Sequence, residues 1–144
     1  MILVDTSVWI ELLDGRRGAT VGADDLLRFV TCGPVVQEVL QGLRDGPDSE
    51  AFREAFLAIP RLSDPLPFRT FLEAARIYRR GRRKGYTIRS SVDCLIAAVA
   101  IENGVAVWHK DRDFTAISSY TDLQVVEAKA CLRRPPGGLC SLTS

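Results

Sequence analysis

The chain has 144 residues and a mass of 15.9 kDa, which is the usual size of one compact domain. Its residues are 47% hydrophobic and 26% charged, a balance that matches an ordinary globular protein and excludes a disordered, collagen-like or coiled-coil chain. The formal net charge of +1 gives no overall preference for a nucleic-acid partner, so any such preference must come from local clusters of charge.

The first half of the chain predicts a short strand followed by helices. Residues 2–4 are an apolar run that stops at Asp5, beside residues that can cap a helix. Apolar spacing and turn residues predict the next elements: helices over 8–13, 23–29, 34–43 and 48–59, and a brief strand over 30–32.

The second half of the chain predicts the same alternation. A longer helix over 67–83 has a basic last turn, which the helix dipole favours. Its expected inward residues are Phe68, Phe71, Leu72, Ala75 and Tyr78. The remaining predicted elements are a helix over 90–103, a helical turn over 114–118, and strands over 105–108 and 123–126.

Strands that alternate with helices predict an α/β fold. Parallel strands need crossover helices, so we expect a three-layer domain with a small central parallel sheet flanked by helices. This domain spans residues 1–130, and residues 131–144, which contain Pro-Pro-Gly-Gly, are predicted to be a flexible tail.

Acidic residues fall where the predicted strands end and where helices begin. Asp5 follows the first strand, and Asp111 and Asp113 follow the strand over 105–108. Asp93 and Glu38 lie near the starts of two helices. Carboxyl ends of parallel strands share one edge of a sheet, where reactive groups gather. Converging carboxylates repel one another, and a hard divalent cation would relieve that repulsion, so the sequence predicts a metal site.

Each acid also has a structural explanation when it is considered alone. Asp5 can cap a helix, and Asp93 can complete a capping box. Glu38 can be a solvated helix residue, and Asp111 and Asp113 can be turn residues. The presence of all five acids at the ends of strands and the starts of helices favours the metal site over these separate explanations.

Residues 76–89 contain seven basic residues and no acidic residue. Such a stretch can be the solvated end of a helix, or it can bind the phosphates of RNA, with Tyr78 and Tyr86 as stacking faces. The candidate phosphate-binding residues are Arg79, Arg82, Arg83 and Arg89.

The acids stand within four motifs in a fixed order. They are Asp-Thr-Ser over 5–7, Val-Val-Gln-Glu-Val-Leu-Gln-Gly over 35–42, Ser-Val-Asp-Cys-Leu-Ile-Ala-Ala over 91–98, and His-Lys-Asp-Arg-Asp-Phe over 109–114. Over residues 1–126, this set resembles the PIN-domain ribonucleases, specifically the VapC-type toxins.

The resemblance implies a magnesium- or manganese-dependent endoribonuclease that is the toxin of a type II toxin–antitoxin pair. Its implied partners are RNA, a cognate antitoxin, and a second copy of the chain in a homodimer or a toxin–antitoxin hetero-oligomer. The residues that it implies for catalysis are Asp5, Glu38, Asp93 and Asp111, with Asp113 as a further or alternative ligand and Thr6 or Ser7 as polar support. The expected metal ligands are Asp5, Asp93, Asp111 and Asp113.

The residue types agree with metal-assisted hydrolysis. His109 is the only histidine, so acid–base cleavage by a histidine pair is poorly supported. Water activated by a cation would attack phosphorus in line and leave a 5′-phosphate and a 3′-hydroxyl.

Three other functions are compatible with acids at strand ends. A phosphotransfer receiver needs an acidic pair after its first strand, where Asp5 stands alone. A phosphatase of the haloacid dehalogenase type needs Asp-x-Asp, but position 7 is Ser7. A non-catalytic RNA-binding or scaffold module on the same fold is therefore the main alternative.

The cysteines and the first residues of the chain bear on its compartment. Cys32 and Cys94 are expected to be small core residues, and without a Cys-x-x-Cys pair neither zinc nor disulfides are expected for the four cysteines. The longest uncharged apolar run, 94–101, is too short to span a bilayer, and Asp5 interrupts the start before a signal-peptide core forms. We therefore expect a cytoplasmic protein with reduced thiols.

Overall fold

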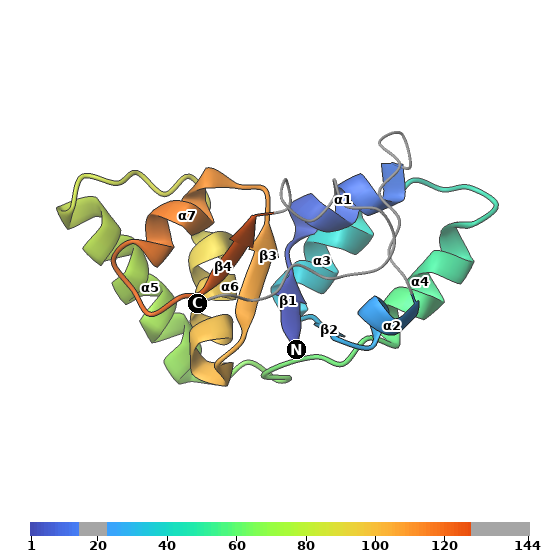
Figure 1. The fold of residues 1–144 in the computed structure, drawn as a ribbon, viewed down its shortest axis with the longest axis horizontal. Helices are drawn as coiled ribbons and strands as arrows, with labels where there is room; N and C mark the ends of the chain where they lie inside the picture. Colours follow the sequence, from blue (N-terminus) through green and yellow to red (C-terminus); the bar gives the residue numbers. More distant parts are fainter. Residues whose placement is uncertain (15–22, 128–144) are drawn as a thin grey trace.

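The computed structural model describes residues 1–14 and 23–127, which form a central sheet with helices around it (Figure 1). The sheet has four parallel strands in the order β2-β1-β3-β4. Its strands are β1 (Ile2–Val4), β2 (Phe29–Val30), β3 (Ala106–His109) and β4 (Val125–Glu127). The described helices are α1 (Thr6–Asp14), α2 (Ala23–Leu26), α3 (Gly33–Gly42), α4 (Ser49–Leu57), α5 (Phe68–Arg83), α6 (Ser91–Asn103) and α7 (Arg112–Ser118).

The predicted fold class, a three-layer α/β domain with a small parallel sheet, is confirmed. Helices α1 and α3 lie beside β1, whereas α6 and α7 lie beside β3 and β4 (Figure 1). Within the described ranges, no helix combines the length and the apolar character that a membrane span requires. The predicted flexible tail, 131–144, lies outside the described residues.

The central strands β1 and β3 pair side by side, and this pairing sets the position of the acids. Leu3 is paired with Val107, and Val4 with Trp108. All the residues of both strands are buried, which explains why they are continuous apolar runs rather than alternating ones. The two strands therefore end together, and the residues that follow them emerge at one edge of the sheet.

Strand β2 begins earlier than the sequence predicted. Phe29 was expected at the end of a helix, but α2 stops at Leu26 and Phe29 pairs with Ile2 in the sheet. The Phe29 ring packs at 5.8 Å from the Trp9 ring and at 5.7 Å from the Trp108 ring. This aromatic packing outweighs the local helix signal, because it buries a large ring that a helix end would leave partly exposed.

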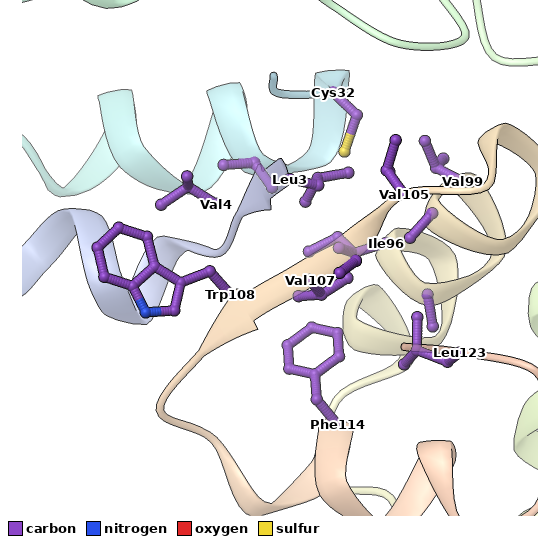
Figure 2. Packing of buried hydrophobic residues seen from close by; sticks show 14 of the residues in the cluster. Leu3, Val4, Cys32, Ile96, Val99, Val105, Val107, Trp108, Phe114 and Leu123 are labelled. Carbon is purple, nitrogen blue, oxygen red and sulfur yellow. The ribbon is translucent and has the colours of Figure 1, made fainter. Parts of the chain in front are cut away.

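Helix α6 is the centre of the hydrophobic core. Residues 96–100 are all fully buried, so the helix is covered on several faces and not only along the predicted stripe. Figure 2 shows Ile96 and Val99 beside Val107 and Leu123. The helix ends as predicted at Gly104, whose φ of 63° is a left-handed conformation that suits glycine.

The inward face of α5 was predicted wrongly except for Tyr78, which is half-buried against the core, because Ala75 too is exposed. Phe68, Phe71 and Leu72 are 75%, 47% and 54% exposed, whereas the buried residues of this helix are Thr70, Ala74, Ile77 and Gly81. Small residues at this spacing let α5 pack closely against α6, and the Thr70 hydroxyl donates a hydrogen bond of 2.8 Å to Glu102. Close helix packing and this bond decide the face, not the greater hydrophobicity of the phenylalanines.

Candidate metal centre

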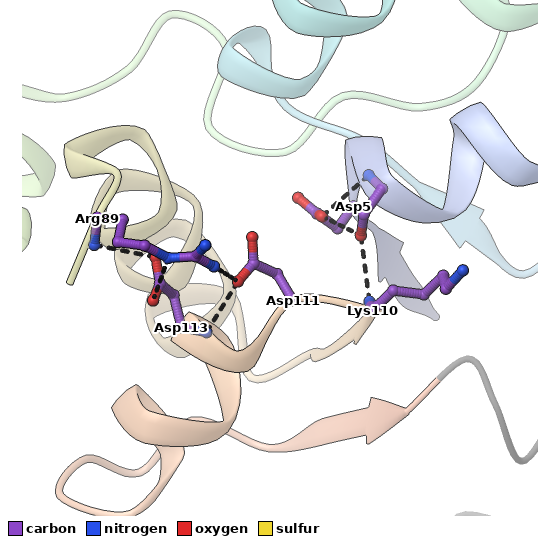
Figure 3. A network of polar contacts seen from close by, with 6 residues as sticks. Asp5, Arg89, Lys110, Asp111 and Asp113 are labelled. Carbon is purple, nitrogen blue, oxygen red and sulfur yellow. Dashed lines mark hydrogen bonds and ion pairs between the residues drawn. The ribbon is translucent and has the colours of Figure 1, made fainter. Parts of the chain in front are cut away.

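The ends of β1 and β3 place acids from distant parts of the sequence at one site. The Asp5 amide donates a hydrogen bond of 2.9 Å to the Trp108 carbonyl, which continues the strand pairing beyond the last strand residue. After β3, the chain turns through Lys110 and Asp111 into α7. Asp5 and Asp111 thus face the same side of the sheet edge (Figure 3).

Three carboxylates form the tightest part of the site. One oxygen each from Asp93, Asp111 and Asp113 lies within 4.8 Å of the others. Asp93 comes from the first turn of α6, and the other two come from the start of α7. Asp93 and Asp113 are buried, at 7% and 3% exposed. Three converging oxygen donors of this kind suit a hard divalent cation.

The electrostatics of the site show the strain of this crowding. Burial, and after it the charges of Asp5, Asp111 and Asp113, together raise the pKa of Asp93 to about 8. Burial also raises the pKa of Asp5, although hydrogen bonds from Ser7 oppose the shift. A bound cation would reverse this effect, because it stabilises the ionised carboxylates.

Asp5 is held in place by Ser7. The Ser7 amide and hydroxyl donate hydrogen bonds of 3.1 Å and 2.6 Å to the same Asp5 oxygen, Oδ2. The Ser7 hydroxyl also accepts a bond of 3.1 Å from the Lys110 amide, so it links the ends of the two central strands. The side chain of Lys110 forms an ion pair with Glu11 of α1.

Glu38 lies at the margin of the site. It is half-buried on α3, and Thr6 donates a hydrogen bond of 2.7 Å to its Oε2. Its charge contributes to the raised pKa of Asp93. The structure therefore brings Asp93, Asp111 and Asp113 together, with Asp5 and Glu38 near enough to act on Asp93 electrostatically.

Helix capping, the structural explanation considered for several acids, is observed for two of them. An acid that caps a helix can still bind a metal ion. Asp5 caps the start of α1 through the Ser7 amide, and Asp111 caps α7 by accepting a 3.0 Å bond from the Asp113 amide. The capping box expected for Asp93 is incomplete, because Ser90 makes no side-chain capping bond. Asp93 is thus a buried acid for which capping gives little reason.

Arg89 contacts two of the acids directly. Its guanidinium Nη2 lies 2.9 Å from Asp111 Oδ1, and its Nε lies 3.6 Å from Asp113 Oδ1. Its amide also donates a 3.0 Å bond to Asp113 Oδ2 (Figure 3). This guanidinium supplies positive charge where a cation would bind. The sequence placed Arg89 in a phosphate-binding stretch but gave no sign of this pairing.

The other candidate phosphate-binding residues lie on the last turns of α5. Arg79, Arg82 and Arg83 are all exposed, and the Arg82 guanidinium lies 6.0 Å from the centre of the Tyr78 ring. Their exposure agrees with contact to a polyanion and equally with a solvated helix end, so their role stays a prediction.

Cys32, Cys94 and His109 are core residues. Burial raises the pKa of both thiols to about 11, which keeps them protonated and unreactive. The buried His109 ring packs 5.3 Å from the Phe114 ring. The expectation that Cys32 and Cys94 are core residues is confirmed, whereas Cys131 and Cys140 lie outside the described residues.

The raised pKa of Asp93 predicts how the stability of the metal-free protein depends on pH. The folded protein holds the Asp93 proton up to about pH 8, whereas the unfolded chain releases it near the ordinary aspartate pKa of 3.8. The contribution of this group to the free energy of unfolding is therefore present below about pH 4 and is lost as the pH rises to about 8.

Urea denaturation in a chelator at pH 5 and pH 8 checks this prediction. We expect the Asp93→Asn variant to lose less stability between the two pH values than the parent protein does. Equal losses of stability in the parent protein and the variant would contradict the raised pKa of Asp93.

Comparisons with known proteins identify the family of this chain. The PIN domain family matches residues 2–119, and the chain belongs to this family. Among curated relatives, it is 37% identical to ribonuclease VapC11 of Mycobacterium tuberculosis over 134 residues, which covers 86% of this chain and 96% of the relative. It is 30% identical to ribonuclease VapC32 of the same organism over 131 residues, covering 88% and 98%.

Solved structures share the fold. VapBC-5 from Mycobacterium tuberculosis, described as a member of a family of toxin–antitoxin systems, has a TM-score of 0.64 at 21% identity and covers 88% of this chain and 97% of its own. VapBC2 from Rickettsia felis, bound to a DNA fragment from its promoter, has a TM-score of 0.64 at 16% identity and covers 88% and 98%. The resemblance seen in the four sequence motifs is therefore confirmed at the level of the family.

Proposed function

We propose that this chain is a divalent-metal-dependent endoribonuclease and acts as the toxin of a toxin–antitoxin pair. The observation that carries the proposal is the convergence of Asp93, Asp111 and Asp113 within 4.8 Å at the sheet edge. The relatives named as VapC ribonucleases support it, because they align with most of this chain.

The donor set fits magnesium or manganese. It consists of carboxylates alone, and such hard oxygen donors are the ligands that these cations prefer. We propose Asp93, Asp111 and Asp113 as ligands, with Asp5 as a further ligand from the facing strand end. A cation held there supplies a Lewis acid that activates water and offsets charge on a phosphodiester.

The remaining residues of the site position these acids. Ser7 fixes one oxygen of Asp5 and accepts a bond from the Lys110 amide, so the two strand ends cannot separate without breaking the bond to Lys110. Thr6 orients Glu38 toward the same region, where its carboxylate can accept a proton from water. These contacts keep the site assembled before substrate arrives.

The direct test incubates the purified protein with a mixed RNA pool, with magnesium, with manganese and with a chelator. We expect cleavage only with the metals, and fragments with a 5′-phosphate and a 3′-hydroxyl. Calorimetry with manganese distinguishes this nuclease from the main alternative, because a non-catalytic RNA-binding module need not bind the ion. Cleavage that persists in the chelator would refute the metal mechanism.

We propose that the exposed arginines of α5 hold the RNA backbone. Changing Arg82 and Arg83 together to glutamine should weaken RNA binding and lower its salt dependence, by about 1.4 in the slope of log K against log salt for two lost phosphate contacts. The same double change at the exposed Arg44 and Arg53 is the control. Arg53 belongs to α4, which lies at the end of the molecule opposite α5 (Figure 1). A salt slope equal to that of the parent protein would count against this role.

Arg89 should compete with the metal for Asp111 and Asp113. Because the pair is half-exposed, removing the guanidinium is worth up to about 1 kcal/mol, so Arg89→Met should raise manganese affinity up to about fivefold. Calorimetry in low salt measures the change, and Arg76→Met, at an exposed ion pair on α5, is the control. Weaker manganese binding by the Arg89 variant would show that the guanidinium supports the site instead.

We propose that a cognate antitoxin controls this activity. The comparison structures VapBC-5 and VapBC2 support this partner. Arg89 shows that a guanidinium fits against two of the acids, so an arginine of the antitoxin could pair with Asp5, Glu38 or Asp93 in the same way. Antitoxin affinity should then fall as manganese rises, and light scattering of the same samples will show whether the chain is a homodimer or part of a hetero-oligomer.

A further inference from the structure

A cavity of about 590 Å³ opens directly beside the acidic site. It lies between α7 and the chain that leads from α5 to α6, and Asp111 and Asp113 form part of its wall. Its volume is in the range of small-molecule sites. The other residues that line it include Tyr86, Thr87, Lys110, Arg112, Thr115 and Ser119.

Tyr86 gives the cavity a fixed aromatic wall. Its ring stacks on the buried Tyr120 ring, with centres 5.7 Å apart and planes inclined by 25°. The Ser119 hydroxyl donates a 3.2 Å hydrogen bond to the Tyr86 oxygen. Tyr86 is nevertheless 40% exposed, so a large part of its ring is open to a ligand.

The tyrosine pair is anchored in the body of the protein. The Tyr120 hydroxyl donates a 3.0 Å bond to the Ile77 carbonyl of α5. The Tyr120 hydroxyl can come this close to α5 only because residue 81 is glycine, since a Cβ there would lie 2.4 Å from the Tyr120 oxygen. A glycine inside a helix costs about 1 kcal/mol relative to alanine, and here it makes room for the anchor.

The chemistry of the cavity suits a nucleobase. A base can stack on an exposed tyrosine, and the hydroxyls of Thr87 and Thr115 offer donors and acceptors for its edge. Arg112 places positive charge at the same wall, next to the acids. A nucleotide whose phosphate lies at the acids therefore has a shaped place for its base within reach.

We propose that this cavity binds one nucleobase of single-stranded RNA, next to the phosphate that is cleaved, and that stacking on Tyr86 gives the enzyme a base preference at that position. The inference rests on the proposed ribonuclease function and adds to it a site of specificity. Its location predicts that the preference involves one nucleotide adjoining the cut.

Binding is measured with short single-stranded RNAs that carry 2-aminopurine at successive positions, with Asp93→Asn protein to prevent cleavage. We expect fluorescence quenching at one position adjoining the cut. The double variant Asp93→Asn, Tyr86→Ala should show no quenching at that position. Its affinity for the RNA should be about tenfold lower, which is 1.4 kcal/mol. Tyr86→Phe should retain the quenching. Phe68→Ala removes an aromatic ring that is 75% exposed on α5 and should have no effect.

Cleavage by proteins with Asp93 intact is then mapped on RNA with randomised positions around the cut. Wild-type protein should prefer certain bases at one adjoining position, and Tyr86→Ala should cut with that preference lost. Thr115→Leu, which fills the cavity from an exposed position of α7, should do the same and covers the case in which Tyr86→Ala fails to fold.

Unchanged base preference and affinity in folded Tyr86→Ala or Thr115→Leu would overturn the cavity assignment while wild-type cleavage still supports the nuclease. Failure of the wild-type protein to cut any RNA with metal would instead overturn the proposed function.

Discussion

Asp93→Asn is expected to lower metal-dependent RNA cleavage by roughly a hundred- to a thousandfold, the scale seen when one preorganised electrostatic group is removed. The amide has nearly the same shape as the carboxylate but carries no charge, so it binds a cation weakly. Cleavage is measured under single-turnover conditions at saturating protein. Asp122→Asn, at an exposed position, is the control that should keep full activity.

The same variant should fold at least as well as the parent protein. Burial and neighbouring acids raise the pKa of Asp93 to about 8, which shows that its charged form is disfavoured in the folded state. Removing that charge relieves repulsion, so thermal denaturation in a chelator should give an equal or higher midpoint. An Asp93→Asn protein that cleaves RNA normally would refute the assignment of this residue.

Phe114→Ala is expected to lower the free energy of unfolding by about 3–5 kcal/mol, which is a large share of the roughly 5–15 kcal/mol that stabilises a typical domain. Phe114 is fully buried in the first part of α7, where its ring packs against His109. Alanine would leave a hole under the helix that carries Asp111 and Asp113. Activity should fall as well, because these acids lose their support.

Urea denaturation at fixed pH measures this loss, and Phe68→Ala is the matched control. It removes the same side chain from a position that is 75% exposed, where changes are usually within about 0.5 kcal/mol. Similar losses at the two positions would show that burial in the α7 core does not decide the stability.

The sequence alone predicted the sheet and the position of most acids. Parallel strands have continuous apolar runs, and residues that follow such runs share one edge, so Asp5 and Asp111 could be placed together without coordinates. The helix that carries Asp93 was also clear, because it is long and ends at Gly104 with the expected conformation.

Side-chain contacts between distant segments could not be predicted. The spacing of α5 favoured its phenylalanines as the inward face, but packing against α6 and against the Tyr120 ring selected Thr70, Ala74 and Gly81. The pairing of Arg89 with Asp111 and the stacking of Tyr86 on Tyr120 join residues far apart in the chain. No local pattern marks such contacts, because they depend on how the finished elements pack.

The strand order also has a consequence for how the protein is made. β1 lies between β2 and β3, so one of its edges is paired early in synthesis and the other waits for residues 106–109. The bond between Ser7 and the Lys110 amide joins residues 103 positions apart, and Asp93 and Asp111 arrive equally late. A growing chain therefore lacks the assembled acidic site until most of the domain has left the ribosome. The ribonuclease activity proposed above therefore needs nearly the whole domain, and a nascent chain that ends before residue 111 lacks it.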